Sequence, residues 1–189
     1  MQSSKISEVI TVKGGLLYSL KYNFTSNEKV KVLWDTFQKT RDLSRYYLSL
    51  LKEFDPYQPM KVNNVSVNSV CWMVGHLAWA EVYLLIKATG GKFSNHEWLD
   101  HYALGSDGSL HEEKPEFKNM LAVLKEVHEA AQLHIQQLSD EDLEKDNPLE
   151  LAFGPDKSIR IMIQHAIRHE GTHVGHLSWL VKLNGGSAI

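Results

Sequence analysis

The residues that could do chemistry gather near the C-terminal end of the chain, in the string HAIRHEGTHVGHLSWL, residues 165–180. Within it, His169 to His173 form an H-E-x-x-H string, which lets one helix present two imidazoles to a metal ion. The chain has ten histidines in 189 residues, so the random expectation for such a string is about 0.04. The string therefore favours a metal site, although it is too short to establish one alone.

Four histidines of this string share one side of an α-helix. At about 100° per residue they span roughly 80° of arc. Met162 lies on the same side before them, and Leu180 and Leu183 lie on it after them. A stripe that is apolar at both ends normally faces a core, so we expect some of the four to point into the protein. They are His165, His169, His173 and His176.

A zinc protease is one alternative that the H-E-x-x-H string raises. Such a protease needs a third ligand downstream of the two histidines. No Asp or Glu follows Glu170, and the longer metzincin pattern needs Gly and His where this chain has His176 and Trp179. The sequence therefore argues against a protease, and a third ligand would have to come from upstream.

The upstream candidate is His76, in the string VCWMVGHLAWAEVYLL. On a helix it shares its side with Ser69, Met73, Ala80 and Leu84, so it would face a mainly apolar surface. A lone histidine in such a place is more often a core residue than a ligand. Two ligands from one helix and one from another are nevertheless a common way to build a metal site inside a helical bundle.

Four long segments with helical periodicity would have to position these residues. The first is expected to begin at a capping box of Thr25 and Glu28 and to end before the prolines of DPYQP. Pro115 suits the first turn of the third, and the Asn-Gly-Gly string at 184–186 is a helix stop. The predicted helices cover residues 26–54, 66–89, 115–138 and 158–183.

The remaining segments show few strand signals. Residues 19–24 alternate weakly, and we expect residues 1–25 to form an N-terminal arm. Residues 90–114 form a long connection with room for a short helix, and Ser139 with Asp142 is expected to cap a short turn. The sequence thus predicts an all-α fold, a four-helix bundle in one domain over residues 26–189.

Composition is that of a soluble globular protein, with 43% hydrophobic and 23% charged residues and a net charge of −3. No basic stripe is present, so nucleic-acid binding is not expected. The single cysteine, Cys71, cannot form an intrachain disulfide and would lie about 140° from His76 on a helix, so we interpret it as a core residue. The N-terminus lacks a signal-peptide pattern, and the apolar run at 70–86 looks too short and too polar to span a membrane. We expect a cytoplasmic protein.

The strings NSVCWMVGHLAWAE, LSDEDL and HAIRHEGTHVGHLSWLVKLNGG together resemble the DinB-like superfamily, in the part that includes the bacillithiol S-transferase-like proteins. The resemblance covers about residues 26–186. Its signature is a histidine midway along the second helix and, in the last helix, an H-x-x-x-H pair with a glycine two residues on. In this chain these are His76, His169, His173 and Gly175.

The resemblance implies a DinB-type four-helix bundle with a long crossover connection. It also implies that His76, His169 and His173 bind a divalent metal, commonly zinc or nickel. Characterised relatives transfer or rearrange low-molecular-weight thiol adducts, and many members form homodimers. The expected partners are therefore a small-molecule thiol or electrophile and a second copy of the chain.

A metal-dependent enzyme is the leading expectation. Three neutral imidazoles leave a divalent metal with at least one open position, as in catalytic sites. The charge of the metal would favour the thiolate form of a bound thiol, which is the nucleophile in conjugation, or would activate water for hydrolysis. The alternative is a non-catalytic metal-binding bundle with a role in stress response.

Other residues near the histidines have open roles. Many members have Gln after the signature glycine, where this chain has His176, so the substrate is left open. We interpret His165 and His176 as core residues or as partners that orient the ligands, with an acid/base role as the alternative. The candidate pocket-lining residues, which are more often core residues, are Trp72, Met73 and Tyr83.

Two acidic residues fall outside the histidine stripe, on apolar sides of their helices. Glu170 is expected to be a buried partner for another helix or subunit rather than a protease-type base. Glu81 is expected to pair with an Arg or a His on a neighbouring helix.

Overall fold

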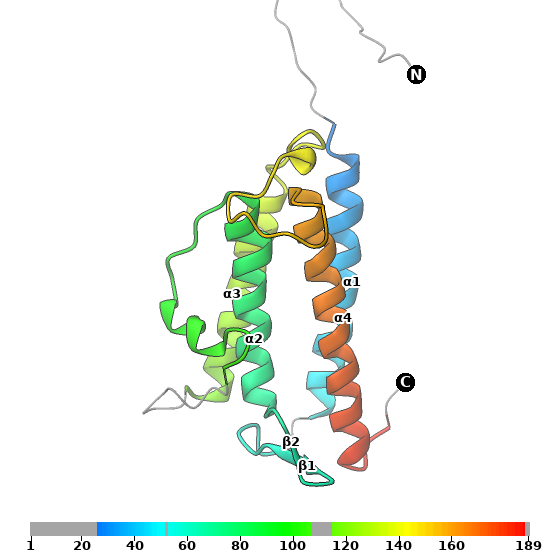
Figure 1. The fold of residues 1–189 in the computed structure, drawn as a ribbon. Helices are drawn as coiled ribbons and strands as arrows, with labels where there is room; N and C mark the ends of the chain where they lie inside the picture. Colours follow the sequence, from blue (N-terminus) through cyan, green and yellow to red (C-terminus); the bar gives the residue numbers. More distant parts are fainter. Residues whose placement is uncertain (1–25, 52, 107–114, 188–189) are drawn as a thin grey trace, which may run out of the picture.

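The structure, a computed structural model, describes residues 26–51, 53–106 and 115–187. The expected N-terminal arm, residues 1–25, lies outside the described residues. Four long helices stand side by side (Figure 1), which confirms the all-α bundle. They are α1 (Glu28–Leu50), α2 (Val70–Glu81), α3 (Phe117–Ile135) and α4 (Ile159–Leu183).

The helices run in two directions. α1 and α4 run the same way, and α2 and α3 run opposite to them (Figure 1). Because α2 and α3 are parallel, the chain must return along the bundle between them. The described part of this crossover contains η3 (Glu97–Tyr102), a 3-10 helix that lies against the outside of α2. The short helix expected within residues 90–114 is therefore present, and it covers α2 beside the histidine His76.

A short hairpin that the sequence analysis missed precedes α2. Strands β1 (Met60–Val62) and β2 (Val65–Val67) pair antiparallel. The two residues between them, Asn63 and Asn64, have φ values of 47° and 67°. The type I′ hairpin turn needs positive φ at both of its two central positions, and asparagine adopts it more readily than most residues. The Asn-Asn pair was the available sequence signal for this hairpin.

The third predicted helix, residues 115–138, needs correction at both ends. It begins at Phe117 with Glu116 as its N-cap, so Pro115 precedes the helix and does not lie in its first turn. It ends at Ile135 rather than at residue 138.

Two further predicted helix ends need correction. The second helix does not begin at residue 66, which lies in β2, but at Val70. Its N-cap is Ser69, whose side chain accepts a hydrogen bond from the backbone N–H of Trp72. The first helix ends at Leu50 and not at residue 54. Phe54 instead packs against the core from the loop that follows.

The start of α1 also differs from the prediction. Glu28 is the first helical residue, so it cannot be the third-position partner of a capping box, and Thr25 lies outside the described residues. Asp140, far along the chain, caps the helix instead. Its carboxylate accepts hydrogen bonds from the Val30 backbone N–H at 3.1 Å and from the Ser26 hydroxyl at 2.9 Å. A side chain far away in the sequence thus caps α1 in place of the predicted local capping box.

The capping box predicted after α3 is confirmed. The Ser139 backbone N–H donates to Asp142 at 2.8 Å, and the Asp142 N–H donates to the Ser139 hydroxyl at 3.2 Å. This box opens η4 (Asp142–Glu144). Further on, Ser158 caps α4 by accepting a hydrogen bond from the Ile161 N–H at 3.2 Å.

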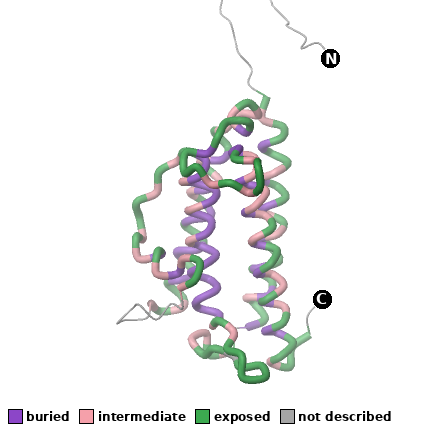
Figure 2. Tube along the Cα trace, in the orientation of Figure 1, coloured by how far each residue is buried: buried purple, intermediate pink, exposed green. Residues whose placement is uncertain are grey.

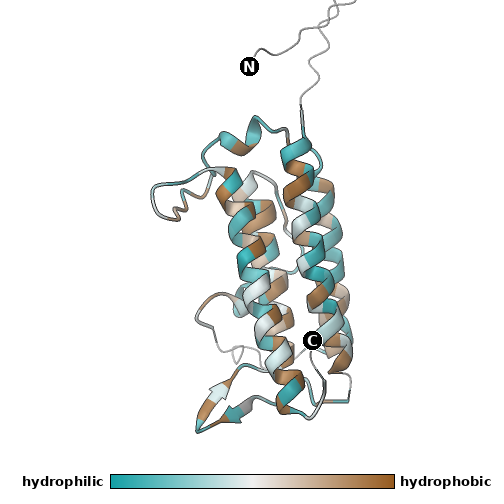
Figure 3. Cartoon of the chain, turned by 90° about the vertical axis from the view of Figure 1, so that its right-hand side faces the viewer, coloured by the Kyte–Doolittle hydropathy of each residue, from teal (hydrophilic) through white to brown (hydrophobic). Residues whose placement is uncertain are grey.

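Helix α2 is the core helix of the bundle and is buried almost all round (Figure 2). It continues as a π-helical turn, η1 (Val82–Ile86), and a 3-10 turn, η2 (Lys87–Thr89), and stops at Gly90, whose φ is 92°. Along the other long helices hydrophilic and hydrophobic residues alternate (Figure 3), as expected when one side faces the core. The burial of α2 puts His76 inside the protein.

The same helix bears on the question of a membrane span. Within the described residues, Val70–Thr89 is long and apolar enough to cross a membrane, with a mean hydropathy of 1.2 over its best window. The expectation that the run at 70–86 is too short and too polar to span a membrane is therefore wrong as regards length and composition. However, 83% of that window is buried inside the bundle, as in the core helix of a soluble protein.

Candidate metal centre

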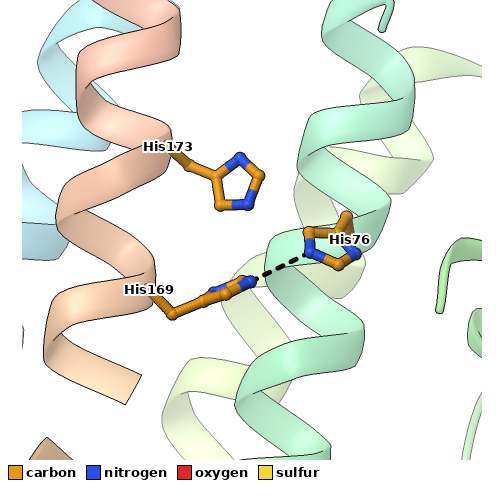
Figure 4. A group of neighbouring side chains, drawn as sticks. All are labelled: His76, His169 and His173. Atoms are coloured by element: carbon orange, nitrogen blue, oxygen red, sulfur yellow. Dashed lines mark hydrogen bonds between the residues drawn. The ribbon is translucent and has the colours of Figure 1, made fainter. Parts of the chain in front are cut away.

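Three imidazoles meet between α2 and α4 (Figure 4). His169 and His173 lie one turn apart on α4 and point toward α2, which carries His76. The Nε2 atoms of His76 and His169 are 3.0 Å apart. One ring nitrogen of each histidine lies within 4.8 Å of the other two. The structure thus brings together the three histidines chosen from the sequence, which we call the histidine triad.

The spacing of these nitrogens suits one divalent metal. Bonds of about 2.0–2.1 Å to a shared zinc ion place tetrahedral nitrogen ligands about 3.4 Å apart. The 3.0 Å between the Nε2 atoms of His76 and His169 is close to this value. Among the described residues, no other group of three His, Cys, Asp or Glu side chains brings its possible ligand atoms this close together. The residues present therefore fit such an ion.

The crossover segment orients the His76 ring. Its Nδ1 lies 2.7 Å from the backbone carbonyl oxygen of Tyr102, at the end of η3. A carbonyl can only accept, so Nδ1 carries the proton and Nε2 presents its lone pair to His169 and His173. An N–H bonded to a carbonyl is the usual support for a metal-binding histidine. No sequence signal could reveal this partner, since it is a backbone atom 26 residues away.

A glycine allows η3 to come this close to α2. A Cβ atom at Gly75 would lie 2.5 Å from the aromatic ring of Tyr102, far inside contact distance. The neighbouring rings complete the support, because Trp72 stacks on His76 with ring centroids 4.6 Å apart. Trp79 also stacks on His76, at 5.7 Å. The His76 ring is therefore held by a hydrogen bond and by stacked indoles.

Burial keeps the triad neutral. It is the main reason why the pKa of His169 is lowered to about 4 and that of His173 to about 3, and the neighbouring imidazoles lower both further. Burial also lowers the pKa of His76 below its ordinary value, although the Tyr102 carbonyl opposes this. Neutral imidazole is the form that binds metals. At neutral pH all three side chains are therefore available as ligands.

The other two histidines of the stripe lie at its ends. His176 is exposed, and its Nδ1 is 3.4 Å from the Nδ1 of His173. His165 is half-buried and stacks on Phe153 with ring centroids 3.9 Å apart. Neither belongs to the close group of three nitrogens. His176 is thus placed beside a triad residue, and His165 beside the loop that precedes α4.

The candidate lining residues have different surroundings. Trp72 lies against His76, whereas Met73 is buried in the core. Tyr83 stacks on Trp79 and lines a small cavity, partly open to solvent, under the crossover. That cavity is lined by no triad residue. A second, smaller cavity borders His169.

Both acidic residues have the partners that the sequence analysis expected. Arg41 of α1 pairs with Glu170 at 2.8 Å and with Glu81 at 2.9 Å. Glu81 also lies 2.8 Å from Nδ1 of His128 on α3. Arg41 itself was missed, although it shares the apolar side of α1 with Phe37. A charged residue on that side was the available signal.

The comparisons with known proteins agree with this architecture. A protein-family model described as the DinB superfamily matches residues 36–177. This match covers most of the chain and includes all three triad histidines. A search among curated proteins finds no match.

Proposed function

Since this chain belongs to the DinB superfamily, and since its three histidines fit a metal ion, we propose that it is a divalent-metal-dependent enzyme. The ligands are His76, His169 and His173. The observation that carries the proposal is that three buried or half-buried imidazoles from two helices converge within 4.8 Å. Zinc and nickel are the metals we propose, because imidazole nitrogen suits both.

The proposed chemistry is activation of a small nucleophile. A divalent metal with an open position lowers the pKa of a thiol or water that reaches it. The chain itself holds the triad neutral by burial, fixes the His76 ring through the Tyr102 carbonyl and shields that ring with Trp72. His176, exposed beside His173, is the group we propose to accept the released proton.

The substrate class we propose is a low-molecular-weight thiol that is transferred to an electrophile. Its support is the resemblance of the His76 and His169–His173 motifs to bacillithiol S-transferase-like proteins. Hydrolysis by activated water is the second reaction that such a site allows. A homodimer and a cytoplasmic location are part of the same proposal. The one cysteine, Cys71, is buried and can form no intrachain disulfide, which suits a reducing compartment.

A non-catalytic metal-binding bundle with a role in stress response is the second candidate. One observation favours it. The cavity beneath the crossover is lined by none of the triad histidines, so this space does not bring a substrate to them. In such a protein the metal would stabilise the junction of α2 and α4 without turnover.

The test begins with metal analysis of protein purified without a metal-affinity column. Metal-loaded protein is then screened for conjugation of small thiols to model electrophiles and for hydrolysis. We expect about one divalent ion per chain and a conjugation rate above that of free thiol, both lost in His173→Ala. His96→Asn is the control, since His96 lies outside the triad and Asn tolerates its positive φ of 59°. A bound metal without any rate enhancement would support the non-catalytic bundle instead.

A further inference from the structure

A buried ionic network connects all four long helices. It consists of Arg41 on α1, Glu81 on α2, His128 on α3 and Glu170 on α4. The side chains of Arg41 and Glu81 are fully buried, and that of Glu170 is 2% exposed. The proposed reaction uses none of these four residues, so the network needs an explanation of its own.

At the centre of the network, one guanidinium binds two carboxylates. Arg41 donates from Nε to Glu170 Oε1 at 2.8 Å and from Nη2 to Glu170 Oε2 at 3.0 Å. Its Nη1 lies 2.9 Å from Oε2 of Glu81, an ion pair without hydrogen-bond geometry. Because the guanidinium is rigid and planar, its hydrogen bonds to Glu170 and its ion pair with Glu81 hold the two carboxylates at a set spacing. They belong to α4 and α2, the two helices that carry the triad.

Both carboxylates lie close to metal-binding positions along their helices. Glu170 directly follows His169. Glu81 is five residues beyond His76, which is about 7.5 Å along an α-helix. The smaller cavity is lined by Glu81, Glu170 and His169 together, so the network and the triad border the same space. A shift of α2 against α4 at the network would therefore separate His76 from His169.

The rest of the network limits such a shift. The Ser44 hydroxyl donates to Oε1 of Glu170, and Nδ1 of His128 lies 2.8 Å from Oε1 of Glu81. The His128 ring is itself stacked on Trp34, with ring centroids 5.2 Å apart. Each carboxylate is thus held from α1 and from a second side chain, and neither can move without breaking buried contacts.

Stability alone is a weak explanation for this network. Burying ions costs free energy, and apolar or neutral replacements of whole buried ion networks are often as stable as the original. What a neutral replacement cannot supply is a fixed spacing between two helices. Fixed spacing is what three converging ligands require, since a metal site tolerates little displacement of its ligands.

We propose that Arg41 is a positioning residue for the metal centre. Acting through Glu81 and Glu170, it sets the spacing and register of α2 and α4, which bring His76 to His169 and His173. The proposal rests on the proposed metal site. It assigns no contact between Arg41 and the metal or substrate.

The main test separates metal binding from stability. The triple variant Arg41→Met/Glu81→Gln/Glu170→Gln removes the guanidinium and both carboxylates of the network at nearly constant volume. Metal-free protein is titrated with Co²⁺, whose visible spectrum reports ligand geometry, and its unfolding by denaturant is measured in parallel. We expect cooperative unfolding at least as stable as wild type, with Co²⁺ affinity lowered about tenfold or more and an altered spectrum. Wild-type affinity and spectrum in a folded triple variant would overturn the proposal.

A second variant and a control complete the experiment. Arg41→Lys keeps the charge but loses the fork, and we expect it to fold and to bind Co²⁺ about tenfold more weakly. Ile135→Ala removes a fully buried side chain from α3, which carries no ligand, and should lower stability without changing Co²⁺ affinity. The network would be purely structural under any of three outcomes. Ile135→Ala could lose as much Co²⁺ affinity as the network variants, Arg41→Lys could keep wild-type affinity, or both network variants could fail to fold. If wild type itself binds no Co²⁺, the proposed function fails before this question arises.

Discussion

At the scale of single residues, spacing limited the candidate ligands to His76 and one stripe of four histidines. The resemblance to the DinB-like superfamily then selected His169 and His173 from that stripe. The support of the triad could not be predicted in either way. The Tyr102 carbonyl that orients His76 is a backbone atom and leaves no mark in the sequence. Arg41 had a recognisable sequence signal, because it is a charged residue on the apolar side of its helix.

Removing one triad histidine should release the metal. His76→Ala leaves only two imidazoles, and a site of three protein ligands cannot easily lose one, so divalent-metal occupancy should fall at least about tenfold. Occupancy is measured by elemental analysis after dialysis, with His96→Asn as the control. Full metal retention in His76→Ala would show that this residue is not a ligand.

The low histidine pKa values predict how stability depends on pH. In the folded, metal-free protein the pKa is about 4 for His169 and about 3 for His173, below the ordinary value of 6.5. Between these values the unfolded chain binds more protons, so the free energy of unfolding should rise with pH. This contribution to the free energy of unfolding is fully present above about pH 6.5 and is lost as the pH falls toward the pKa values of the folded protein.

Denaturant unfolding of metal-free protein from about pH 7 to about pH 4 measures this dependence. His173→Gln removes one of the titrating groups and should give a shallower fall in stability over the same range. Curves of equal slope for the two proteins would mean that burial of His173 does not control its protonation.

At the scale of elements, two helix starts with a local side-chain cap were predicted, whereas the local cap of α2 at Ser69 and the distant cap of α1 were missed. Ser158 and the Ser139–Asp142 box lie directly beside the helices they cap. The start of α1 is capped by Asp140, 110 residues beyond Val30 in the chain, and no local pattern indicates that contact. Two consecutive asparagines gave a weak local signal for the β1–β2 hairpin. The hairpin was missed because the helix was predicted to begin at residue 66.

The N-cap of α4 gives a direct test of element stability. Ser158→Ala removes the hydroxyl that accepts from the Ile161 N–H, which should cost about 1 kcal/mol of unfolding free energy. Ser158→Asp retains an acceptor at this position and should stay close to wild type. Chemical denaturation compares the three proteins, and an alanine variant as stable as wild type would show that solvent replaces the cap.

The packing of η3 on α2 gives a second test at this scale. In Gly75→Ala the new Cβ would meet the Tyr102 ring at 2.5 Å, so η3 must move outward. We expect a loss of about 1–3 kcal/mol in unfolding free energy, as for other overpacked cores, and weaker metal retention because the Tyr102 carbonyl moves with its ring. The double variant Gly75→Ala/Tyr102→Leu makes room for the methyl group and should recover part of both losses. Unchanged metal retention in Gly75→Ala would mean that the carbonyl contact does not support the site.

At the scale of the whole molecule, the four-helix architecture followed from the sequence because four long helical segments with clear stops leave few alternatives. The order in which the helices pack did not follow from periodicity, since a crossover is visible only as a long connection. The structure also shows exposed apolar residues that the sequence pattern did not indicate. Side chains on the outer side of α1 include large apolar residues spaced by three and four positions, as in helices that pair with another helix. They are Leu43, Tyr46 and Leu50.

This surface is where we expect the proposed homodimer to form. Trp179 of the neighbouring helix α4 is 65% exposed, and Leu43 is 45% exposed. Light scattering at micromolar concentration should give a dimer mass for wild type and a monomer mass for Leu43→Glu/Trp179→Glu. Circular dichroism serves as the control that the variant keeps its helices. A monomeric wild type would refute the dimer, and a dimeric double variant would place the interface elsewhere.

The distance along the chain between the triad residues has a consequence for biosynthesis. His76 and His169 are 93 residues apart, and α4 leaves the ribosome after α1, α2 and α3. At typical elongation rates of about 5–20 residues per second, the nascent chain carries His76 for several seconds before its partners exist. A nascent chain therefore offers a metal one imidazole on an unfinished bundle, and capture must wait until α4 has docked. Because metal binding then stabilises the bundle with α4 packed in place, the metal concentration should set the fraction of newly made chains that reach and keep this folded state.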